Sequence, residues 1–421
     1  MTLTQSRATT GWPDLDVVPS GARHEIASRV ARRLFRAAVS RLDITVDELG
    51  ASSYGRGGPV LRIVRPEEFY GRLGRDLLIG FGEGYLTGAW EADDLAGVLT
   101  VMARDLATLI PERLQRFRRF VSQRVPSFHD PSKDNSQDNV AAHYDLSNDL
   151  FRLFLDPGLT YSSALFPTDE AGRPVPPLDL RAAQSRKLER LLDATGVGEG
   201  TRVLEIGTGW GELAIHAARR GARVHTITLS VEQLALAEQR FRDAGVADSI
   251  RAELLDYRDL AGPAHDGQYD VVLSVEMIEA VGAAYWDEYF RILDRMLAPG
   301  GRVGLQAITM PHDRMLATVD SHTFITKYIF PGGFLPSVRV IEEIAESQTG
   351  LRVADRLDFG QHYAETLRQW DAAFLAARDR VLDLGFDEIF IRMWHFYLAY
   401  SQAGFASGYI DVNQFVFEER A

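Results

Sequence analysis

The feature that most constrains the fold is the regular alternation of apolar, strand-like runs with helical segments between residues 201 and 309. The runs are nearly continuous in Val, Ile and Leu, which is typical of strands buried on both faces of a parallel sheet. We expect strands at 201–207, 223–229, 250–256, 270–276 and 301–309, and helices at 211–219, 231–243 and 284–297. The pattern predicts an α/β fold with a doubly wound, mostly parallel sheet that binds ligands beyond the carboxyl ends of its strands.

Other segments flank this alternating region. Residues 311–405 are aromatic-rich and indicate a helical C-terminal insertion before a last strand at 413–419. A short strand at 59–65, followed by helices over 66–107, indicates a smaller, mostly helical domain near the N-terminus. The stretch 125–139 is rich in Pro, Ser, Asp and Asn, which is typical of a linker. The expected parts are an arm (1–20), a helical domain (21–124), a linker (125–142) and the sheet domain (143–421).

Charge is distributed unevenly along the chain. The whole chain has a net charge of −13, which argues against wholesale nucleic-acid binding. Residues 1–124, however, contain 18 Arg, no Lys and 15 acidic residues. The helical period of the segment 23–42 places four apolar residues on one stripe: Ile26, Val30, Leu34 and Leu42. Four arginines flank this stripe: Arg29, Arg32, Arg33 and Arg36. Such a helix either lies on an anionic membrane surface or packs on a core with a solvated basic face. A second basic stretch, 113–124, shares this pattern.

Cysteine is absent, so the chain has no disulfide, thiolate metal ligand or thiol nucleophile. No apolar run has membrane-spanning length, and the histidines show no metal-binding spacing such as HExxH. We therefore expect a cytoplasmic protein without a metal, attached to the membrane only peripherally.

A glycine-rich turn, Gly207-Thr208-Gly209-Trp210-Gly211, joins the first strand of the alternating region to its helix. Such a turn brings backbone amides close to a ligand. The dinucleotide motif GxGxxG fails because Glu212 stands at its third glycine, and the Gly-Lys-Ser/Thr of a Walker A loop is missing. With these two motifs excluded, the turn fits S-adenosylmethionine, an adenosyl ligand without a pyrophosphate. The alternative is a glycine-rich turn that binds no ligand. Asp256 and Tyr257 are placed for its adenine, and Glu205 for its methionine side or the loop.

Several longer motifs occur in order: HYDLSNDLFRLFLDPGLTYSSALF (143–166), VLEIGTGWGELA (203–214), TLSVEQ (228–233), LDYRDL (255–260), MIEAVG (277–282) and KYIFPGGFLPS (327–337). Through these motifs, residues 143–420 resemble the cyclopropane-fatty-acyl-phospholipid synthase family. The segment GEGYLTGAWEADDL (82–95) extends the resemblance into the N-terminal domain. That family contains S-adenosylmethionine-dependent methyltransferases that act on the cis double bond of acyl chains. The resemblance implies a sheet of the class I methyltransferase type.

The resemblance also implies site residues. The family's cofactor-contacting positions are matched by Tyr161, Ser162, Gly207, Thr228, Gln233 and Tyr257, beside Glu205, Gly209 and Asp256 from the turn and strand ends. Family members hold a bicarbonate, thought to accept the proton, with a Cys, a Glu, a His, an Ile and a Tyr. Glu279, Ile308 and Tyr363 match three of these, whereas Ser163 replaces the Cys and Gln306 replaces the His. Gln306 is the larger change, because an amide donates a hydrogen bond but does not ionise near pH 7.

The implied reaction leaves a carbocation on the acyl chain, which aromatic faces stabilise. Proton loss then gives a cyclopropane or, after a hydride shift, a methylene branch. The changes at Gln306 and Ser163 favour, by a small margin, a divergent member of the 10-methylene stearate type. The implied partners are unsaturated phospholipid acyl chains at an anionic membrane, a second copy of the chain, and a reductase if the product is methylene-branched. Two alternatives stay open: a methyltransferase for a soluble acceptor, and a lipid-binding protein without catalysis.

Overall fold

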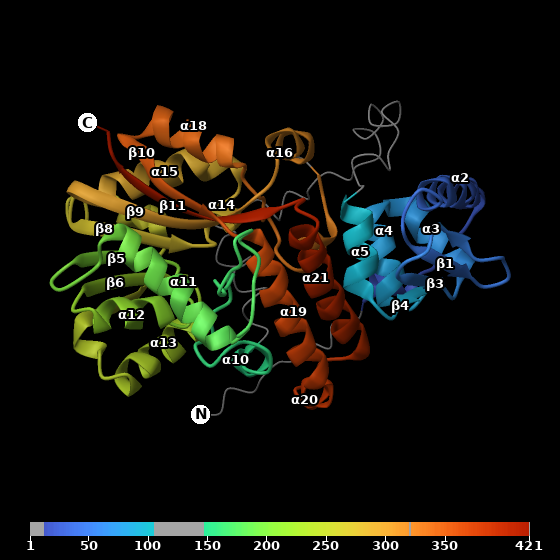
Figure 1. Ribbon diagram of the computed structural model, residues 1–421, viewed down its shortest axis with the longest axis horizontal. Coiled ribbons are helices and arrows are strands. Elements are labelled where there is room, and N and C mark those ends of the chain that lie inside the picture. Colours follow the sequence, from blue (N-terminus) through green and yellow to red (C-terminus); the bar gives the residue numbers. More distant parts are fainter. Residues whose placement is uncertain (1–11, 105–146, 320, 421) are drawn as a thin grey trace. The chain divides into compact units, whose positions relative to one another are not determined.

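The computed structural model describes residues 12–104, 147–319 and 321–420, and the chain divides into two compact units, 1–122 and 123–421 (Figure 1). The expected second basic helix at 113–124, the linker and most of the N-terminal arm lie outside the described residues. None of the described helices has both the length and the apolar character that crossing a bilayer requires.

The N-terminal unit combines helices with a small sheet. Its helices are α1 (Pro13–Asp16), α2 (Ala22–Val39), α3 (Pro66–Asp76), α4 (Leu78–Leu86) and α5 (Leu95–Arg104). Its strands are β1 (Thr45–Glu48), β2 (Tyr54–Gly55), β3 (Val60–Ile63) and β4 (Trp90–Ala92), in the order β2-β1-β3-β4. Only β3 was expected: β2 and β4 are shorter, and β1 (TVDE) is as long as β3 but lacks an apolar run. α3 begins with Pro66, whose fixed φ suits the first helical turn.

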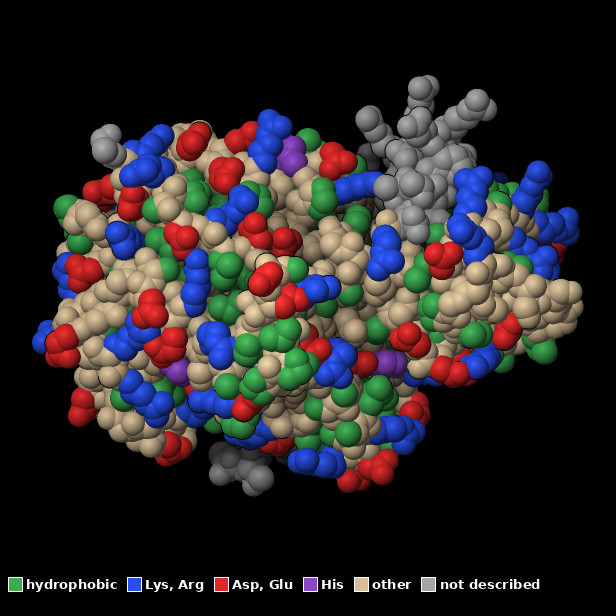
Figure 2. Space-filling model, viewed as in Figure 1, with side chains coloured by type: hydrophobic (Ala, Val, Ile, Leu, Met, Phe, Trp, Pro, Cys, Tyr) green, Lys and Arg blue, Asp and Glu red, His purple; other side chains and the backbone are tan. Residues whose placement is uncertain are grey.

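Helix α2 differs from its expected packing. Phe35 and Val39 are its buried residues, and Leu42 is buried beyond its end. Ile26, Val30 and Leu34, in contrast, are 63%, 53% and 45% exposed. The expected stripe is therefore wrong for Leu42, which lies beyond the end of the helix and is buried. The other three residues of the stripe face away from the core. Lys and Arg side chains gather over the region of α2 (Figure 2).

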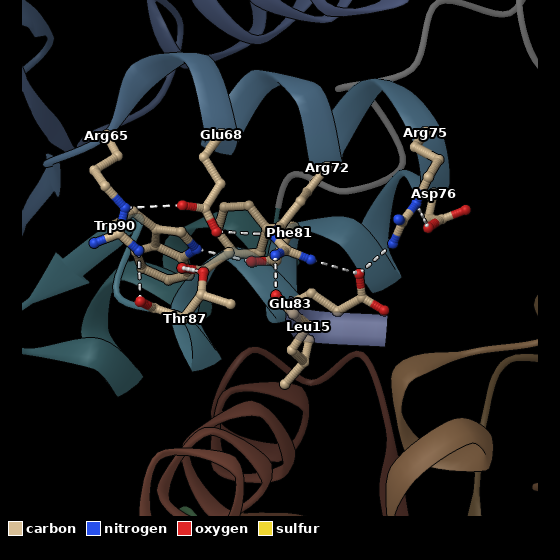
Figure 3. Close-up of polar contacts among 11 residues, drawn as sticks. Leu15, Arg65, Glu68, Arg72, Arg75, Asp76, Phe81, Glu83, Thr87 and Trp90 are labelled. Carbon is tan, nitrogen blue, oxygen red and sulfur yellow. Dashed lines mark hydrogen bonds and ion pairs between the residues drawn. The ribbon is translucent and has the colours of Figure 1, made fainter. Parts of the chain in front are cut away.

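A buried ion-pair network connects α3 and α4 (Figure 3). The side chain of Arg72 is fully buried; its Nε donates to Glu68 over 3.0 Å, and its guanidinium lies 3.6 Å from Glu83. Arg72 also donates to the carbonyl of Leu15 over 2.6 Å, so part of the expected loose arm is held against the core. Arg75 pairs with Glu83 from the other side over 2.7 Å. Each buried carboxylate of this network thus has a guanidinium partner.

The second unit contains the expected doubly wound sheet, with strand order β10-β11-β9-β8-β5-β6-β7. Its strands are β5 (Arg202–Ile206), β6 (Arg223–Thr228), β7 (Ile250–Leu254), β8 (Tyr269–Val275), β9 (Leu297–Thr309), β10 (Leu351–Asp358) and β11 (Asp411–Glu419). Strands β5 to β9 pair in parallel, and β11 is antiparallel to both β9 and β10. The switch in strand order lies between β5 and β8, where such sheets bind ligands.

Helices cover both faces of this sheet (Figure 1). One core includes residues of α11 (Leu180–Thr195), α12 (Glu212–Arg219) and α13 (Val231–Asp243), and the other includes residues of α15 (Trp286–Met296) and α18 (Val338–Gln348). The remaining α-helices are α10 (Asn148–Phe151), α14 (Ile278–Val281), α16 (His312–Thr318), α17 (Phe324–Tyr328), α19 (Gly360–Ala376), α20 (Arg378–Asp383) and α21 (Glu388–Ala406).

The C-terminal insertion is helical, as expected, but it is interrupted by β10, which the sequence analysis missed. β10 lies at the edge of the sheet, and most of its side chains are exposed or half-buried. Its sequence, LRVADRLD, therefore lacks the continuous apolar character of the inner strands. Strand β7 is also shorter than expected, because Asp256 caps a short 3-10 helix (Tyr257–Leu260).

Candidate active site

Candidate site residues lie at or just beyond the carboxyl ends of the parallel strands. They are Glu205 in β5, Thr228 in β6, Asp256 after β7, Glu276 after β8, and Gln306 and Ile308 near the end of β9. Parallel strands end at the same edge of a sheet, so these side chains are brought together although up to about a hundred residues separate them in the chain. The register pairs Val275 of β8 directly with Gln306 of β9.

The glycine-rich turn has the backbone that its sequence predicts. Gly207, Gly209 and Gly211 have φ values of 100°, 51° and 86°, in the left-handed region that favours glycine. A Cβ on Gly207 would lie 2.7 Å from Met277 Cγ, and one on Gly211 would lie 2.4 Å from Phe241 Cε1. A Cβ on Gly209 would meet nothing within 4 Å. Packing therefore requires the outer two glycines, whereas Gly209 leaves open space beside the turn.

Glu205 is buried beneath this turn. The hydroxyl of Thr226 donates to its carboxylate over 2.5 Å and lies 2.7 Å from the Thr208 hydroxyl. Burial raises the pKa of Glu205 to about 8, although the Thr226 hydrogen bond and the charge of Lys187 oppose this rise. The carboxyl group is therefore poised to gain or lose a proton when a charged ligand arrives.

The residues expected around the adenosine lie along the neighbouring strand ends. The Thr228 hydroxyl donates to the Gln233 side chain over 2.9 Å, at the start of α13. Asp256 accepts from Arg258 at both carboxylate oxygens, over 2.9 and 2.6 Å, so its expected contact with adenine has a competitor. Tyr257 packs edge-to-face on Tyr289, with ring centroids 5.3 Å apart. The roles of these residues toward a cofactor stay predictions.

The loop after α10 brings Tyr161 and Ser162 to the same region. Tyr161 shares a hydrogen bond of 2.9 Å with the hydroxyl of Tyr397 from α21. The Ser162 hydroxyl accepts from the ammonium of Lys187 over 2.7 Å. Lys187 is fully buried on α11, and burial lowers its pKa to about 8 despite the acidic groups around it. Sequence reasoning missed Lys187, because a single Lys in a helix resembles any solvated basic residue.

Glu276 occupies the centre of the region where the expected anion-binding residues meet. The backbone amide of Ser163 and the amide of Gln306 donate to its Oε1 over 3.0 and 2.7 Å. The hydroxyl of Tyr363, from α19, donates to its Oε2 over 2.7 Å. The pKa of Glu276 is raised by burial, although these donors and the charge of Lys187 oppose the rise. Three predicted residues thus converge on a carboxylate that was not among the predictions.

Two partners fix this arrangement. The Gln306 carbonyl oxygen accepts from the Gln414 amide over 3.0 Å, which turns the NH₂ of Gln306 toward Glu276. The Ser163 hydroxyl donates to the carbonyl of Ala164 over 3.1 Å, so Ser163 uses its backbone and not its side chain. Glu276 is the last residue of an expected strand. It could have been found by inspecting the end of every expected strand for ionisable side chains.

Glu279 lies one helical turn further, in α14. Its Oε1 accepts from the backbone amide of Ile308 over 2.5 Å, which explains why Ile308 belongs to the site. Its Oε2 is buried and receives no hydrogen bond from any of the described residues. Burial and the charge of Glu276 raise the pKa of Glu279 to about 8, against the Ile308 hydrogen bond. Two adjacent carboxyl groups with one nearby Lys favour a pair in which one carboxyl is ionised and the other protonated.

Aromatic rings surround the two tyrosines of the site. Tyr363 stacks on Phe405, with centroids 4.5 Å apart, and meets Trp370 at a right angle over 6.1 Å. Trp370 in turn lies 5.3 Å from Tyr161. These rings come from α19, α21 and the loop after α10, which are distant in sequence. Their faces make the region suitable for stabilising a cation.

Among the described residues, no group of three or more His, Asp and Glu side chains is arranged to hold a metal ion.

Comparisons with known proteins give a consistent result. The sequence profile of the family described as mycolic acid cyclopropane synthetase matches residues 131–415. A tuberculostearic acid methyltransferase from Mycobacterium tuberculosis is 49% identical over 407 residues, covering 96% of this chain and 94% of its own length. A cyclopropane-fatty-acyl-phospholipid synthase from Escherichia coli is 34% identical over 370 residues, 87% of this chain and 90% of its own. A mycolic acid cyclopropane synthase crystallised with SAH and CTAB has a TM-score of 0.59 and 32% identity, covering 70% of this chain and 99% of that chain.

Proposed function

This chain belongs to the mycolic acid cyclopropane synthetase family, and from that membership and the site we propose that it methylates unsaturated fatty acyl chains with S-adenosylmethionine. It is an S-adenosylmethionine-dependent C-methyltransferase that acts at the cis double bond of its substrate. The observation that carries the proposal within this chain is the convergence of Glu276, Glu279 and Tyr363 beside the glycine-rich turn.

The residues of the strand ends fit the cofactor. The open space beside Gly209, the buried Glu205 and the Thr228–Gln233 pair offer a backbone cradle, a titratable carboxyl and polar side chains. We propose that the cofactor-binding residues are those expected: Tyr161, Ser162, Glu205, Gly207, Gly209, Thr228, Gln233, Asp256 and Tyr257. When bound, S-adenosylmethionine supplies an electrophilic methyl group on a sulfonium.

The remaining site residues have to handle a cation on the acyl chain. The alkene is a weak nucleophile, so the protein must hold it close to the electrophile in a site without water. The rings of Tyr363, Trp370 and Tyr161 offer faces to the positive charge. We assign the removal of the proton to the region of Glu276 and Glu279, whose hydrogen-bond donors are Ser163, Gln306, Ile308 and Tyr363.

We propose a methylene-branched product over a cyclopropane. The site holds Gln306 where the cyclopropane-forming pattern has His, and the 49% identical relative is a tuberculostearic acid methyltransferase. A hydride shift before proton loss places the cation on the methyl-bearing carbon, and proton loss from the methyl group then gives an exocyclic methylene. A reductase would be needed to convert that product into a saturated methyl branch.

The test is incubation of the purified protein with S-adenosylmethionine and vesicles of an oleoyl phospholipid, followed by proton NMR of the extracted lipid. We expect vinylidene signals. Cyclopropane methylene signals in their place would show that the branching assignment is wrong while the methyltransferase assignment stands. No modified lipid, with release of S-adenosylhomocysteine from a soluble acceptor, would reject the acyl-chain substrate.

We propose that α2 attaches the enzyme peripherally to an anionic membrane surface, from the cytoplasmic side. Ile26, Val30 and Leu34 form an exposed apolar stripe, and the exposed Arg29 and Arg33 lie next to it. Apolar insertion and attraction of Arg to phosphate reinforce each other at such a surface. A homodimer would strengthen this attachment by presenting two such helices.

A further inference from the structure

We propose that Glu276 is the catalytic base of this enzyme, a carboxylate of the chain itself standing where the family resemblance predicts a bound bicarbonate. The inference rests on the proposed methyl transfer to an alkene, and it identifies the group that removes the proton.

The hydrogen bonds around Glu276 carry the argument. The family's bicarbonate positions correspond here to Ser163, Glu279, Gln306, Ile308 and Tyr363. The Ser163 amide, the Gln306 amide and the Tyr363 hydroxyl all donate to Glu276, over 3.0, 2.7 and 2.7 Å. The Ile308 amide donates to Glu279. Each of these donors therefore already serves a carboxylate of the chain.

A separate bicarbonate does not fit this donor set. It would have to displace Glu276 from three hydrogen bonds or lie beside two carboxyl groups without donors of its own. Lys187 is the cation whose charge acts on Glu276, and its ammonium donates to Ser162. A third acidic group would also raise the pKa of a pair in which the pKa of Glu279 is already raised to about 8.

The backbone supports a functional assignment for Glu276. Its φ is +52°, in the left-handed region that a side-chain-bearing residue seldom adopts. Such strain persists where the surroundings fix it and is common at active sites. Here the backbone amide of Glu276 donates to the carbonyl of Gln306 over 2.8 Å, so the residue is tied at both its main chain and its side chain to β9.

The reaction balances with this base. The alkene π electrons form the new C–C bond, and the C–S bond of the sulfonium breaks with its electron pair remaining on sulfur. A hydride then moves from the methyl-bearing carbon to the adjacent cationic carbon. Glu276 removes a proton from the methyl group, the C–H electrons form the exocyclic double bond, and the carboxylate becomes a carboxylic acid. Glu276 returns this proton to water after the product leaves.

The test compares the whole protein and its variants in decarbonated buffer under nitrogen, with and without added bicarbonate. The substrate is an oleoyl phospholipid vesicle, and the product is quantified by NMR. We expect wild-type turnover to be independent of bicarbonate. We expect Glu276→Gln to lower kcat by about 100-fold or more, the usual contribution of a general base. Glu343→Gln, which changes an exposed Glu paired with Arg339 on α18, is the control and should leave turnover unchanged.

Glu276→Gly is the decisive variant. Glycine adopts a φ of +52° readily, so the backbone should be retained while the carboxylate is removed. Formate or bicarbonate should then fill the freed donors and raise turnover by about tenfold or more over the variant alone. Calorimetry with S-adenosylmethionine and thermal unfolding establish that each variant is folded and binds the cofactor.

The outcomes separate the proposals. Wild-type turnover that requires bicarbonate, full activity of Glu276→Gln, or a folded Glu276→Gly that small carboxylates do not rescue would each overturn the assignment of the base. If neither variant folds, the bicarbonate dependence of the wild type decides alone. A wild-type protein that methylates no lipid under any condition rejects the proposed function instead.

Discussion

Both units of the molecule bury charged side chains, but they balance them differently. In the N-terminal unit, Arg72 lies between Glu68 and Glu83, and Arg65 and Arg75 supply further guanidinium groups (Figure 3). In the sheet unit, Glu205, Glu276 and Glu279 are buried, and the ammonium of Lys187 acts on Glu205 and Glu276. In the first arrangement each buried carboxylate has a guanidinium partner. The second leaves carboxyl groups with raised pKa values, which is the condition for proton transfer.

Removal of Arg72 should have the largest effect on stability. Arg72→Met leaves Glu68 and Glu83 without their buried partner, and we expect a loss of about 3–5 kcal/mol in the free energy of unfolding. Urea unfolding of the N-terminal unit measures it. Arg62→Met breaks an exposed pair with Asp93 and is the control, for which we expect no measurable change. Equal effects of the two substitutions would contradict the contrast between buried and exposed pairs.

The surface of α2 gives the next largest effect. We expect Ile26→Ser/Val30→Ser/Leu34→Ser to weaken binding to anionic vesicles by at least about 100-fold, since burial of each such side chain contributes about 1.5–3 kcal/mol. Vesicle flotation measures this loss. Because these side chains are exposed, thermal unfolding should be unchanged.

Turnover on detergent-dispersed lipid should also survive in the triple variant. A matched Leu49→Ser substitution, at an exposed residue outside α2, should bind vesicles normally. Normal flotation of the triple variant would exclude α2 as the membrane contact.

Lys187 tests the electrostatics of the sheet unit. Lys187→Met removes the cation that favours the ionised forms of Glu276 and Glu205. We expect the acid limb of the kcat/KM profile to move to higher pH by about one unit, equivalent to about 1.4 kcal/mol. Lys187→Arg keeps the charge and should restore part of the profile. A merely structural Lys would change the melting temperature but leave the profile in place.

Glu205 should affect stability alone, in the unliganded protein. Its folded-state pKa of about 8 lies above its ordinary value, so the folded state binds the proton more tightly than the unfolded state. Its contribution to stability is therefore complete below about pH 4.3 and is lost as the pH rises toward 8.

We expect Glu205→Gln to flatten this decline by roughly 1–3 kcal/mol across that window. Thermal unfolding between pH 5 and about 8.5 measures it. Lys187 affects stability in a separate pH window. Its pKa is lowered to about 8, so its contribution to stability is lost as the pH falls from the ordinary pKa of a Lys through 8. A decline of the same slope in the variant and the wild type would mean that Glu205 is ionised throughout.

Much of the sheet was predictable, because strands buried on both faces leave a strong local pattern. The five parallel strands β5 to β9 and the glycine-rich turn lie close to where the sequence analysis expected them. Edge strand β10 and the N-terminal strands β1, β2 and β4 were not expected, since exposed or very short strands need no apolar run. The exposure of Ile26, Val30 and Leu34 was also undecided, because an amphipathic pattern does not reveal whether its apolar side meets a core.

The sequence by itself determined the family and the class of reaction, because ordered motifs are local in the chain. Only the tertiary structure decided what the candidate site residues contact. Ser163, Gln306 and Tyr363 are separated by up to 200 residues, yet all three donate to Glu276. The physical reason is that hydrogen-bond donors are satisfied by whichever acceptor the fold brings within about 3 Å. Here that acceptor is a carboxylate of the chain, at the carboxyl end of β8.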